Sequence, residues 1–237
     1  MRAPVTASLH AWDLSPKEAI ALQKALAGAV VRSDRFGPGG RRAIKRVAGV
    51  DAAFADAGRT IRVAAVLMDY PALVVTDRVL VERPATFPYV PGLLSFREVP
   101  ALLEALGQLP AAPDLILCDG HGYAHPRRFG LACHLGLWLD TPAIGVAKSR
   151  LTGSHEEPGP AKGDVAWLVA DKGVRPGERL GAVLRTRERV KPVYVSAGHR
   201  VSLRTAVALT LRCATRYRLP EPTRLADKLS KAHRTGS

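Results

Sequence analysis

The 237-residue sequence predicts an α/β fold in which one mixed sheet is flanked by helices. Near residue 50, three strand-like runs follow one another with short turn signals between them, which is typical of an antiparallel meander. Beyond residue 94, short apolar runs alternate with helix-like segments, and this pattern is typical of parallel strands joined by crossover helices. No low-complexity linker divides the chain, so we expect a single domain over residues 1–237 that ends in basic helices.

Helix caps and turn residues define the elements of the first half. Residues 15–33 are expected to form an amphipathic helix, because Ser15 and Glu18 match a capping box and Pro16 falls at the first helical position. A loop rich in Gly and Arg follows at residues 35–42. Apolar runs separated by turn signals predict strands at Arg46–Phe54, Thr60–Asp69 and Leu73–Val81.

The second half alternates between helices and short buried strands. Helices are expected at Ser95–Gln108 and Arg128–Leu139, and strands at Asp114–Cys118 and Pro142–Ala147. Three antiparallel strands followed by a βαβαβ unit give a five-stranded mixed sheet with helices on both faces, which is the ribonuclease H-like plan. Later runs are expected to add strands or edges at Val165–Ala170, Leu180–Arg187 and Val193–Ser196, and helices at Ser202–Arg216 and Pro222–Lys231.

The composition narrows the class of protein. Lys and Arg number 35 against 21 Asp and Glu, and an acid-leaning middle at residues 51–174 lies between basic ends. This balance favours a polyanion such as nucleic acid as partner over a merely solvated basic surface. No run of about 18 apolar residues could span a membrane, and the first residues lack a signal-peptide core, so we expect a cytoplasmic protein. Three cysteines without a C-x-x-C pair disfavour a disulfide framework.

Three acidic residues fall where this plan would bring them together. Asp51 lies inside the first strand, where an acid is costly unless it is paired or coordinates a cation. Asp119 follows the strand Asp114–Cys118, at the edge where α/β sheets bind ligands. Glu98 lies near the start of the intervening helix. Oxygen ligands beside a basic surface suit Mg²⁺ or Mn²⁺ rather than zinc.

Each of these residues also has a purely structural interpretation. Asp119 and Gly120 could form a simple turn, and Ser95 with Glu98 matches a capping box at a helix start. Asp51 could pair with a buried Lys or Arg. Taken alone, each structural interpretation is as credible as a metal site, but the joint placement of all three acids on one crevice favours the metal site.

Two further features lie at the same edge of the predicted sheet. The loop after Asp119 contains Gly120 and Gly122, which would let a ligand approach the backbone closely. Lys148 follows an apolar run at the end of the next strand. Donors for phosphate at a predicted helix start are His125, Arg127 and Arg128. The alternatives are an exposed basic loop and a surface lysine whose stem covers apolar residues.

At these residues the sequence resembles the endonuclease V family. The resemblance extends from Asp34 to Asp227, nearly the whole chain. The matching segments are Val47–Asp51, Pro88–Glu98 (PYVPGLLSFRE), Asp119–Gly122 with His125–Arg128 (DGHG and HPRR), Gly145–Lys148 and Tyr217–Asp227. The strings PYVPGLLSFRE and DGHG with HPRR are long, so chance agreement is improbable.

The resemblance implies an activity and a set of catalytic residues. It implies a metal-dependent endonuclease that recognises deaminated adenine (inosine) and hydrolyses the second phosphodiester bond 3′ to it, initiating DNA repair. Asp51, Asp119 and Glu98 would hold Mg²⁺, for which Mn²⁺ would substitute, and Asp227 would lie near the water shell of the metal. Lys148 would lie beside the scissile phosphate. Some family members have His where this chain has Asp227.

The resemblance also implies how the base is recognised. Tyr89, held between prolines, would wedge into the base stack, although a structural turn is the commoner fate of such a string. The flipped base would enter a pocket lined by backbone, where an N–H would favour the hypoxanthine carbonyl over the adenine amine. The residues expected to bind nucleic acid are Pro88, Tyr89, Val90, Pro91, Gly120, His121, Gly122, His125 and Arg127.

Other functions stay open at this point. The partner is expected to be DNA containing deoxyinosine, with single-stranded DNA and inosine RNA as further substrates, and we expect a monomer that does not bind membranes. The same acidic triad could belong to a junction resolvase of the same fold or to an inosine-specific ribonuclease. A nucleic-acid-binding protein without chemistry is the third class. The PYVPG segment argues against a resolvase, and the four residues Asp51, Glu98, Asp119 and Lys148 argue against a protein without chemistry.

Overall fold

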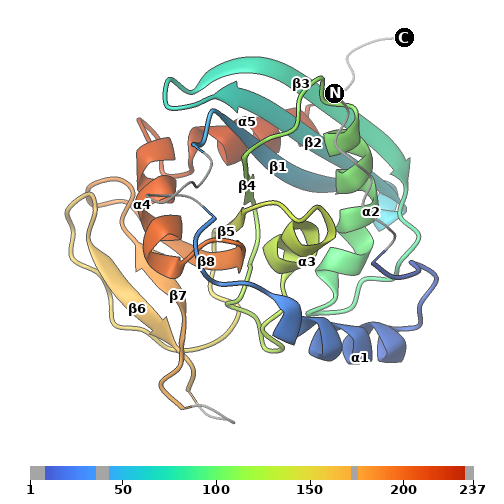
Figure 1. Cartoon of the computed structure of the whole chain (residues 1–237), viewed down its shortest axis with the longest axis horizontal. Coiled ribbons are helices and arrows are strands. Elements are labelled where there is room, and N and C mark those ends of the chain that lie inside the picture. The colour runs from blue at the N-terminus through green and yellow to red at the C-terminus, as the bar shows by residue number, and fades with distance from the viewer. Residues whose placement is uncertain (1–8, 36–42, 172–175, 233–237) are drawn as a thin grey trace.

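A single sheet of eight strands runs through the protein (Figure 1). The computed structural model describes residues 9–35, 43–171 and 176–232, and the strand order within them is β3-β2-β1-β4-β5-β8-β7-β6. The strands are β1 (Arg46–Ala55), β2 (Thr60–Asp69), β3 (Val74–Pro84), β4 (Leu115–Cys118), β5 (Ala143–Ala147), β6 (Val165–Val169), β7 (Arg179–Leu184) and β8 (Val193–His199). The predicted antiparallel β1–β2–β3 meander and the parallel pairing of β1, β4 and β5 are both confirmed.

The sheet continues beyond its five-stranded core into the later runs, which were predicted to add strands or edges. Strand β8 pairs antiparallel with β5, and β7 and β6 extend the sheet from there. The late runs of the sequence therefore become full members of the central sheet and do not form a separate edge structure. Because β5 and β8 are far apart in the chain, no local pattern could have specified this pairing.

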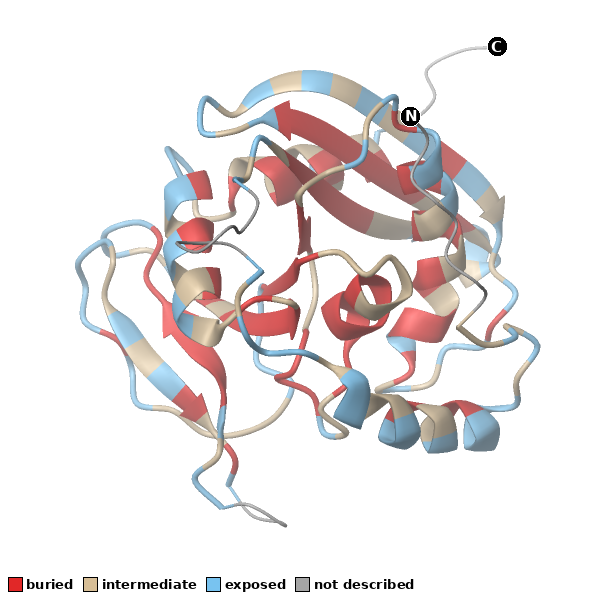
Figure 2. Ribbon diagram, in the orientation of Figure 1, coloured by how far each residue is buried: buried red, intermediate tan, exposed pale blue. Residues whose placement is uncertain are grey.

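Helices cover both faces of the sheet, as expected. They are α1 (Pro16–Leu26), a short 3₁₀ turn (Ala27–Ala29), α2 (Leu94–Gly107), α3 (Leu131–Trp138), α4 (Leu203–Cys213) and α5 (Glu221–Ser230). One core cluster joins α2 and α3 to one face of the sheet, and a second joins α4 and α5 to the other. Successive residues of β4 alternate between the two clusters, so its strand is buried on both sides (Figure 2).

Several helix predictions were wrong in their bounds or caps, and one of them is the helix expected over Ser202–Arg216, which ends at Cys213. The helix expected over residues 15–33 forms the predicted capping box, with Ser15 N–H donating to Glu18 at 2.8 Å, but it ends at Leu26. Helix α2 begins at Leu94, so Ser95 is not its N-cap and the capping-box interpretation of Glu98 is wrong. The Gly- and Arg-rich loop lies mostly outside the described residues.

The helix expected from Arg128 begins three residues later, at Leu131. Arg128 adopts a left-handed backbone with φ of 59°, which is incompatible with a helix interior. The expectation that phosphate donors lie at the start of this helix is therefore wrong. The helix begins only after the residues concerned, which are His125, Arg127 and Arg128.

Helix α5 lies directly on the backbone of β1. A Cβ at Gly49 would lie 2.0 Å from the carbonyl carbon of Pro222, so only glycine permits this approach. The close packing brings Asp227 and Ser230 of α5 to the strand that carries Asp51. Among the described helices, none is long and apolar enough to cross a bilayer.

Candidate active site

The candidate site lies where β4 and β5 end beside the middle of β1. Val50 pairs with Cys118 in the parallel β1–β4 ladder, and the N–H of Asp119 donates to the carbonyl of Val50 at 3.1 Å. Asp51 and Asp119 are therefore adjacent, as the predicted strand order requires. Lys148 follows β5 at once and lies at the same edge.

Three aspartates form a tight group, which we call the carboxylate cluster: Asp51, Asp119 and Asp227. Each offers a carboxylate oxygen, and these oxygens all lie within 4.8 Å of one another. Lys148 extends into the group, with Nζ 2.5 Å from Asp119 Oδ2 and a hydrogen bond donated to Asp227 Oδ1. Lys231 Nζ donates to the same oxygen of Asp227 at 2.6 Å. Two lysines thus compensate part of the negative charge.

Asp51 is the buried member of the carboxylate cluster. Burial raises the pKa of its carboxyl to about 7, and the charges of Asp119 and Asp227 act in the same direction. The Ser230 hydroxyl donates to Asp51 Oδ2 at 2.5 Å and opposes this rise in pKa. Among the described residues Asp51 has no basic partner within salt-bridge distance, so the interpretation as one half of a buried ion pair is wrong.

Glu98 lies behind the carboxylate cluster on α2. It is buried, and burial raises the pKa of its carboxyl well above the usual range, with further contributions from the charges of Asp51 and Asp119. It does not belong to the group of oxygens within 4.8 Å of one another. Its predicted role as a metal ligand stays a prediction, and Asp227 occupies a more central position than expected.

The carboxylate cluster fits a hard divalent cation. Three carboxylates converge, and the mutual repulsion that raises the pKa of Asp51 would be relieved by a cation between them. Asp119 Oδ2 is buried and, although Lys148 is close, accepts no well-directed hydrogen bond from a described residue. Oxygen donors without cysteine or histidine are typical of Mg²⁺ or Mn²⁺ sites.

The PYVPG segment, predicted to wedge into the base stack, forms an exposed turn next to the buried side chain of Phe87. Tyr89 is 72% exposed, whereas Phe87 is buried against Phe96 with ring centroids 5.7 Å apart. The N–H of Leu93 donates to the carbonyl of Val90 at 2.9 Å and closes the turn. A large aromatic ring held in solvent is costly for a purely structural turn and suits a partner surface.

The carbonyl of Gly92 anchors this turn by accepting three hydrogen bonds. Gln23 Nε2 donates at 3.0 Å, Arg127 Nη2 at 2.7 Å and His125 Nε2 at 3.0 Å. Burial lowers the pKa of His125 to about 4, so its ring is neutral at pH 7. The structure therefore shows His125 and Arg127 holding the turn, while Arg128 pairs with Glu178 at 3.0 Å. A direct contact of His125 or Arg127 with nucleic acid stays a prediction.

The glycine-rich loop after Asp119 packs on the sheet. A Cβ at Gly122 would lie 2.3 Å from the carbonyl oxygen of Ala197, so this glycine is required by the protein backbone and not by an approaching ligand. Its N–H donates to Ser196 Oγ at 2.9 Å and is not available to a base. The backbone N–H groups of Gly120 and His121 donate to no described residue, which leaves them as the candidates for recognising a carbonyl.

Sequence reasoning missed several residues that hold the site together. Ser230 and Lys231 follow Asp227 by three and four positions on α5 and its end, a helical spacing that could have revealed them. Arg218 donates from Nη2 to the carbonyl of Lys148 at 2.7 Å and to that of Pro192 at 2.8 Å. No local pattern in the sequence indicates the Arg218 contacts.

A mixed sheet with carboxylates and a lysine gathered beside its parallel strands is typical of phosphodiester hydrolases of the ribonuclease H-like class. The model of the Endonuclease V family matches residues 24–228, and the chain belongs to this family. It is 49% identical over 223 residues to Endonuclease V of Nostoc punctiforme, covering 94% of this chain and 97% of the relative.

Solved structures agree with this assignment. The crystal structure of Endonuclease V from Streptomyces avermitilis superposes with a TM-score of 0.84 at 46% identity and covers 93% of both chains. Endonuclease V of Ciona intestinalis, crystallised with a 24mer DNA containing an inosine followed by a ribo-adenosine, gives a TM-score of 0.77 at 28% identity, covering 91% of this chain and 95% of the other. The predicted fold class and the prediction of an endonuclease are confirmed.

Proposed function

We propose that this endonuclease uses a divalent cation to hydrolyse the second phosphodiester bond 3′ to inosine, and that this cut initiates DNA repair. The observation that carries the proposal is the carboxylate cluster with Lys148 inserted into it at the ends of adjacent strands. The family of the chain and the inosine-containing DNA bound to the Ciona relative support inosine as the recognised base.

The proposed metal ligands are Asp51, Asp119 and Asp227, with Glu98 as the buried acid behind them. A bound Mg²⁺, or Mn²⁺ in its place, would polarise a phosphate oxygen and lower the pKa of an attacking water. Ser230 fixes the orientation of the Asp51 carboxylate through its hydrogen bond. The carboxylates are therefore pre-positioned by the strand ends and by α5.

Lys148 supplies the positive charge that phosphate hydrolysis requires. Burial lowers the pKa of Lys148, but the hydrogen bonds and charges of Asp119 and Asp227 raise it more, so the net direction is upward and the side chain stays protonated. Arg218 holds the backbone of this residue in place. A cation fixed here would stabilise the charge that develops on the phosphate oxygens during attack.

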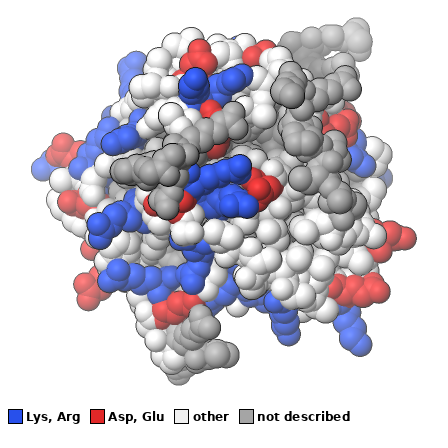
Figure 3. Space-filling model, in the orientation of Figure 1, with Lys and Arg blue, Asp and Glu red and all other residues white. Residues whose placement is uncertain are grey.

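Recognition of the base would use the exposed ring of Tyr89 and two backbone donors. The ring of Tyr89 would stack in the place of the displaced base, since its 72% exposure leaves the ring face available. The N–H groups of Gly120 and His121, which donate to no described residue, would donate to the carbonyl of hypoxanthine, which adenine lacks. Many Lys and Arg side chains lie on the face shown in Figure 3, and they would contact the phosphate backbone.

Cleavage mapping tests this proposal. Matched single- and double-stranded DNA and RNA oligonucleotides, with inosine or adenosine at one position, are incubated with protein and Mg²⁺ or with a chelator. We expect metal-dependent cleavage of inosine strands at the second bond on the 3′ side. Cleavage of branched DNA without inosine would favour a resolvase, and cleavage of inosine RNA alone would favour a ribonuclease.

The proposal also includes a cellular context. We expect a monomer of 25.4 kDa, a cytoplasmic location and no membrane partner. Light scattering of the purified protein, alone and with inosine DNA, would measure the oligomeric state. A mass of twice this value at the concentrations used for cleavage would contradict the monomer.

A further inference from the structure

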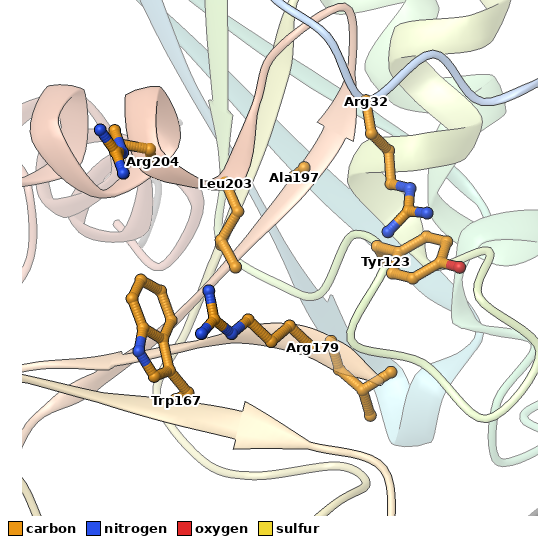
Figure 4. A pocket seen from close by; sticks show the side chains of 8 residues that line it. Arg32, Tyr123, Trp167, Arg179, Ala197, Leu203 and Arg204 are labelled. Carbon is orange, nitrogen blue, oxygen red and sulfur yellow. The ribbon is translucent and has the colours of Figure 1, made fainter. Parts of the chain in front are cut away.

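A pocket of about 370 Å³ lies apart from the carboxylate cluster, between the β6–β7 hairpin, the start of α4 and the segment after α1 (Figure 4). We call it the arginine pocket, and its principal lining residues are Arg32, Tyr123, Trp167, Arg179, Leu203 and Arg204. Leu180 and Ala197 complete an apolar floor. The proposed cleavage chemistry uses none of these side chains.

The three arginines of this pocket have no acceptor among the residues that the structure describes. Arg32, Arg179 and Arg204 make no hydrogen bond or ion pair with any residue that the structure describes. The undescribed segments contain neither Asp nor Glu, so no acidic side chain there could pair with them. Other arginines nearby are paired: Arg128 with Glu178, and Arg200 with Asp140 at 2.6 Å.

Glu178, the acid near Arg32, is already engaged. It accepts hydrogen bonds from the hydroxyl of Tyr123 at 2.5 Å and from Arg128 at 3.0 Å. Three guanidinium groups that form no ion pair with a described carboxylate line this pocket, and a local excess of positive charge favours an anion. Guanidinium groups bind phosphate in particular, because their forked donors match its oxygens.

Aromatic rings form both ends of the pocket (Figure 4). Trp167 is 41% exposed on strand β6, and the Arg179 guanidinium carbon lies 4.6 Å from its ring centroid. At the other end, the Arg32 guanidinium carbon lies 3.9 Å above the ring of Tyr123. Stacked arginine and tryptophan side chains provide a flat surface on which a base can stack.

We propose that the arginine pocket binds one nucleotide unit, with its base against Trp167 and Arg179 and its phosphate between the arginines. The cavity volume suits a ligand of this size. This inference rests on the proposed function, because the nucleotide would belong to the flanking region of the nucleic-acid strand that is bound at the metal site. A free mononucleotide presents the same chemistry, so the test separates the two sources.

Trp167 provides a local reporter for this binding. The chain has three tryptophans, and Trp12 and Trp138 stack on each other with ring centroids 4.7 Å apart. The indole N–H signals of ¹⁵N-labelled protein are followed by NMR without metal, and the variant Trp167→Phe identifies the signal of Trp167. Thymidine 5′-monophosphate, thymidine, inorganic phosphate and an inosine-free oligothymidylate are titrated in turn.

We expect the mononucleotide and the oligothymidylate to shift the Trp167 signal, and thymidine or phosphate alone to bind at least tenfold more weakly. The double variant Arg179→Ala/Arg204→Ala should weaken binding of the mononucleotide by about tenfold or more, the value of one charged hydrogen bond. The control Arg189→Ala removes an exposed arginine whose only described ion pair is with Glu188. It should leave this affinity unchanged.

The source of the nucleotide follows from the same titrations. Tighter binding of the oligothymidylate than of the mononucleotide assigns the pocket to a nucleic-acid strand, and equal affinities assign it to a free nucleotide. An unmoved Trp167 signal, or equal shifts with thymidine and its phosphate, would overturn the proposal. Since the assay contains neither inosine nor metal, these outcomes are independent of whether the protein cleaves inosine strands.

Discussion

The carboxylate cluster and the arginine pocket are both concentrations of like charge, but they treat that charge in opposite ways. At the carboxylate cluster, Lys148 and Lys231 pair with the acids, and Ser230 hydrogen-bonds to the buried one. At the arginine pocket, no described carboxylate pairs with the three guanidinium groups. The carboxylate cluster is held by partners within the protein. The arginine pocket has no described acidic partner, so its positive charge is available to a bound anion.

This difference is the one expected between a catalytic site and a binding surface. A catalytic site must hold its groups in a fixed geometry before the substrate arrives, and internal partners provide that geometry. A binding surface gains affinity when its donors are unpaired, because a ligand then replaces only water. We therefore expect substitutions at the carboxylate cluster to change the cleavage rate, and substitutions of exposed stacking or basic residues to change binding.

Asp119→Asn should have the largest effect on activity. The change removes one charged oxygen of the carboxylate cluster while preserving shape, so metal-dependent cleavage should be lost while inosine strands still bind. Single-turnover cleavage and gel-shift affinity on one oligonucleotide would measure both quantities. Asp69→Asn, at an exposed position on β2, is the matched control. Cleavage near the wild-type rate in Asp119→Asn would remove this residue from the metal site.

Lys148→Ala should lower the single-turnover rate by about 10²–10³-fold while affinity decreases much less. Lys148→Arg keeps the charge but changes its shape, so it should restore the rate only in part. Lys24→Ala, at an exposed position on α1, is the matched control. If Lys148→Ala instead bound poorly and cleaved normally at saturation, the lysine would only position the phosphate.

Tyr89→Ala should weaken binding of inosine strands by roughly 1–3 kcal/mol, the contribution of one aromatic–base stack. The carboxylate cluster does not include this residue, so excess enzyme should recover the cleavage rate. Tyr217→Ala removes another exposed tyrosine and serves as the control. Equal affinity of Tyr89→Ala and wild type would support the interpretation of the PYVPG segment as a purely structural turn.

The smallest effect is expected from single charges outside both regions. Arg212 and Arg216 are exposed at the end of α4 and just beyond it. If either side chain binds a phosphate group, its replacement by Ala should reduce the salt slope of binding by about 0.9. Affinities of Arg212→Ala and Arg216→Ala, measured over a series of salt concentrations, provide this slope. An unchanged slope in both variants would place the nucleic acid on another face.

Part of this organisation could be predicted from the sequence. Alternating helices and strands specify a parallel order, so the adjacency of Asp51 and Asp119 and the place of Lys148 followed from the strand order. The capping box at Ser15 is a local signal and was predicted correctly. In each case the interaction depends on nearby residues or on a rule of topology.

The remaining contacts join segments that are distant in the chain. Ser230 meets Asp51 across 179 positions, and Gln23 meets the Gly92 carbonyl across 69. The pairing of β8 with β5 and the arginine pocket also bring together segments that are far apart in the chain. Charge and hydropathy patterns cannot identify such pairs, because many other positions in the chain carry the same residue types.

Anomalous diffraction from crystals grown with Mn²⁺ would locate the metal site. We expect an anomalous peak bounded by the carboxylates of Asp51, Asp119 and Asp227, within roughly 2.5 Å of at least two of their oxygens. The peak should disappear in Asp119→Asn crystals and persist in Asp69→Asn crystals. A peak elsewhere on the protein, with none at the carboxylate cluster, would show that these three aspartates do not form the metal site.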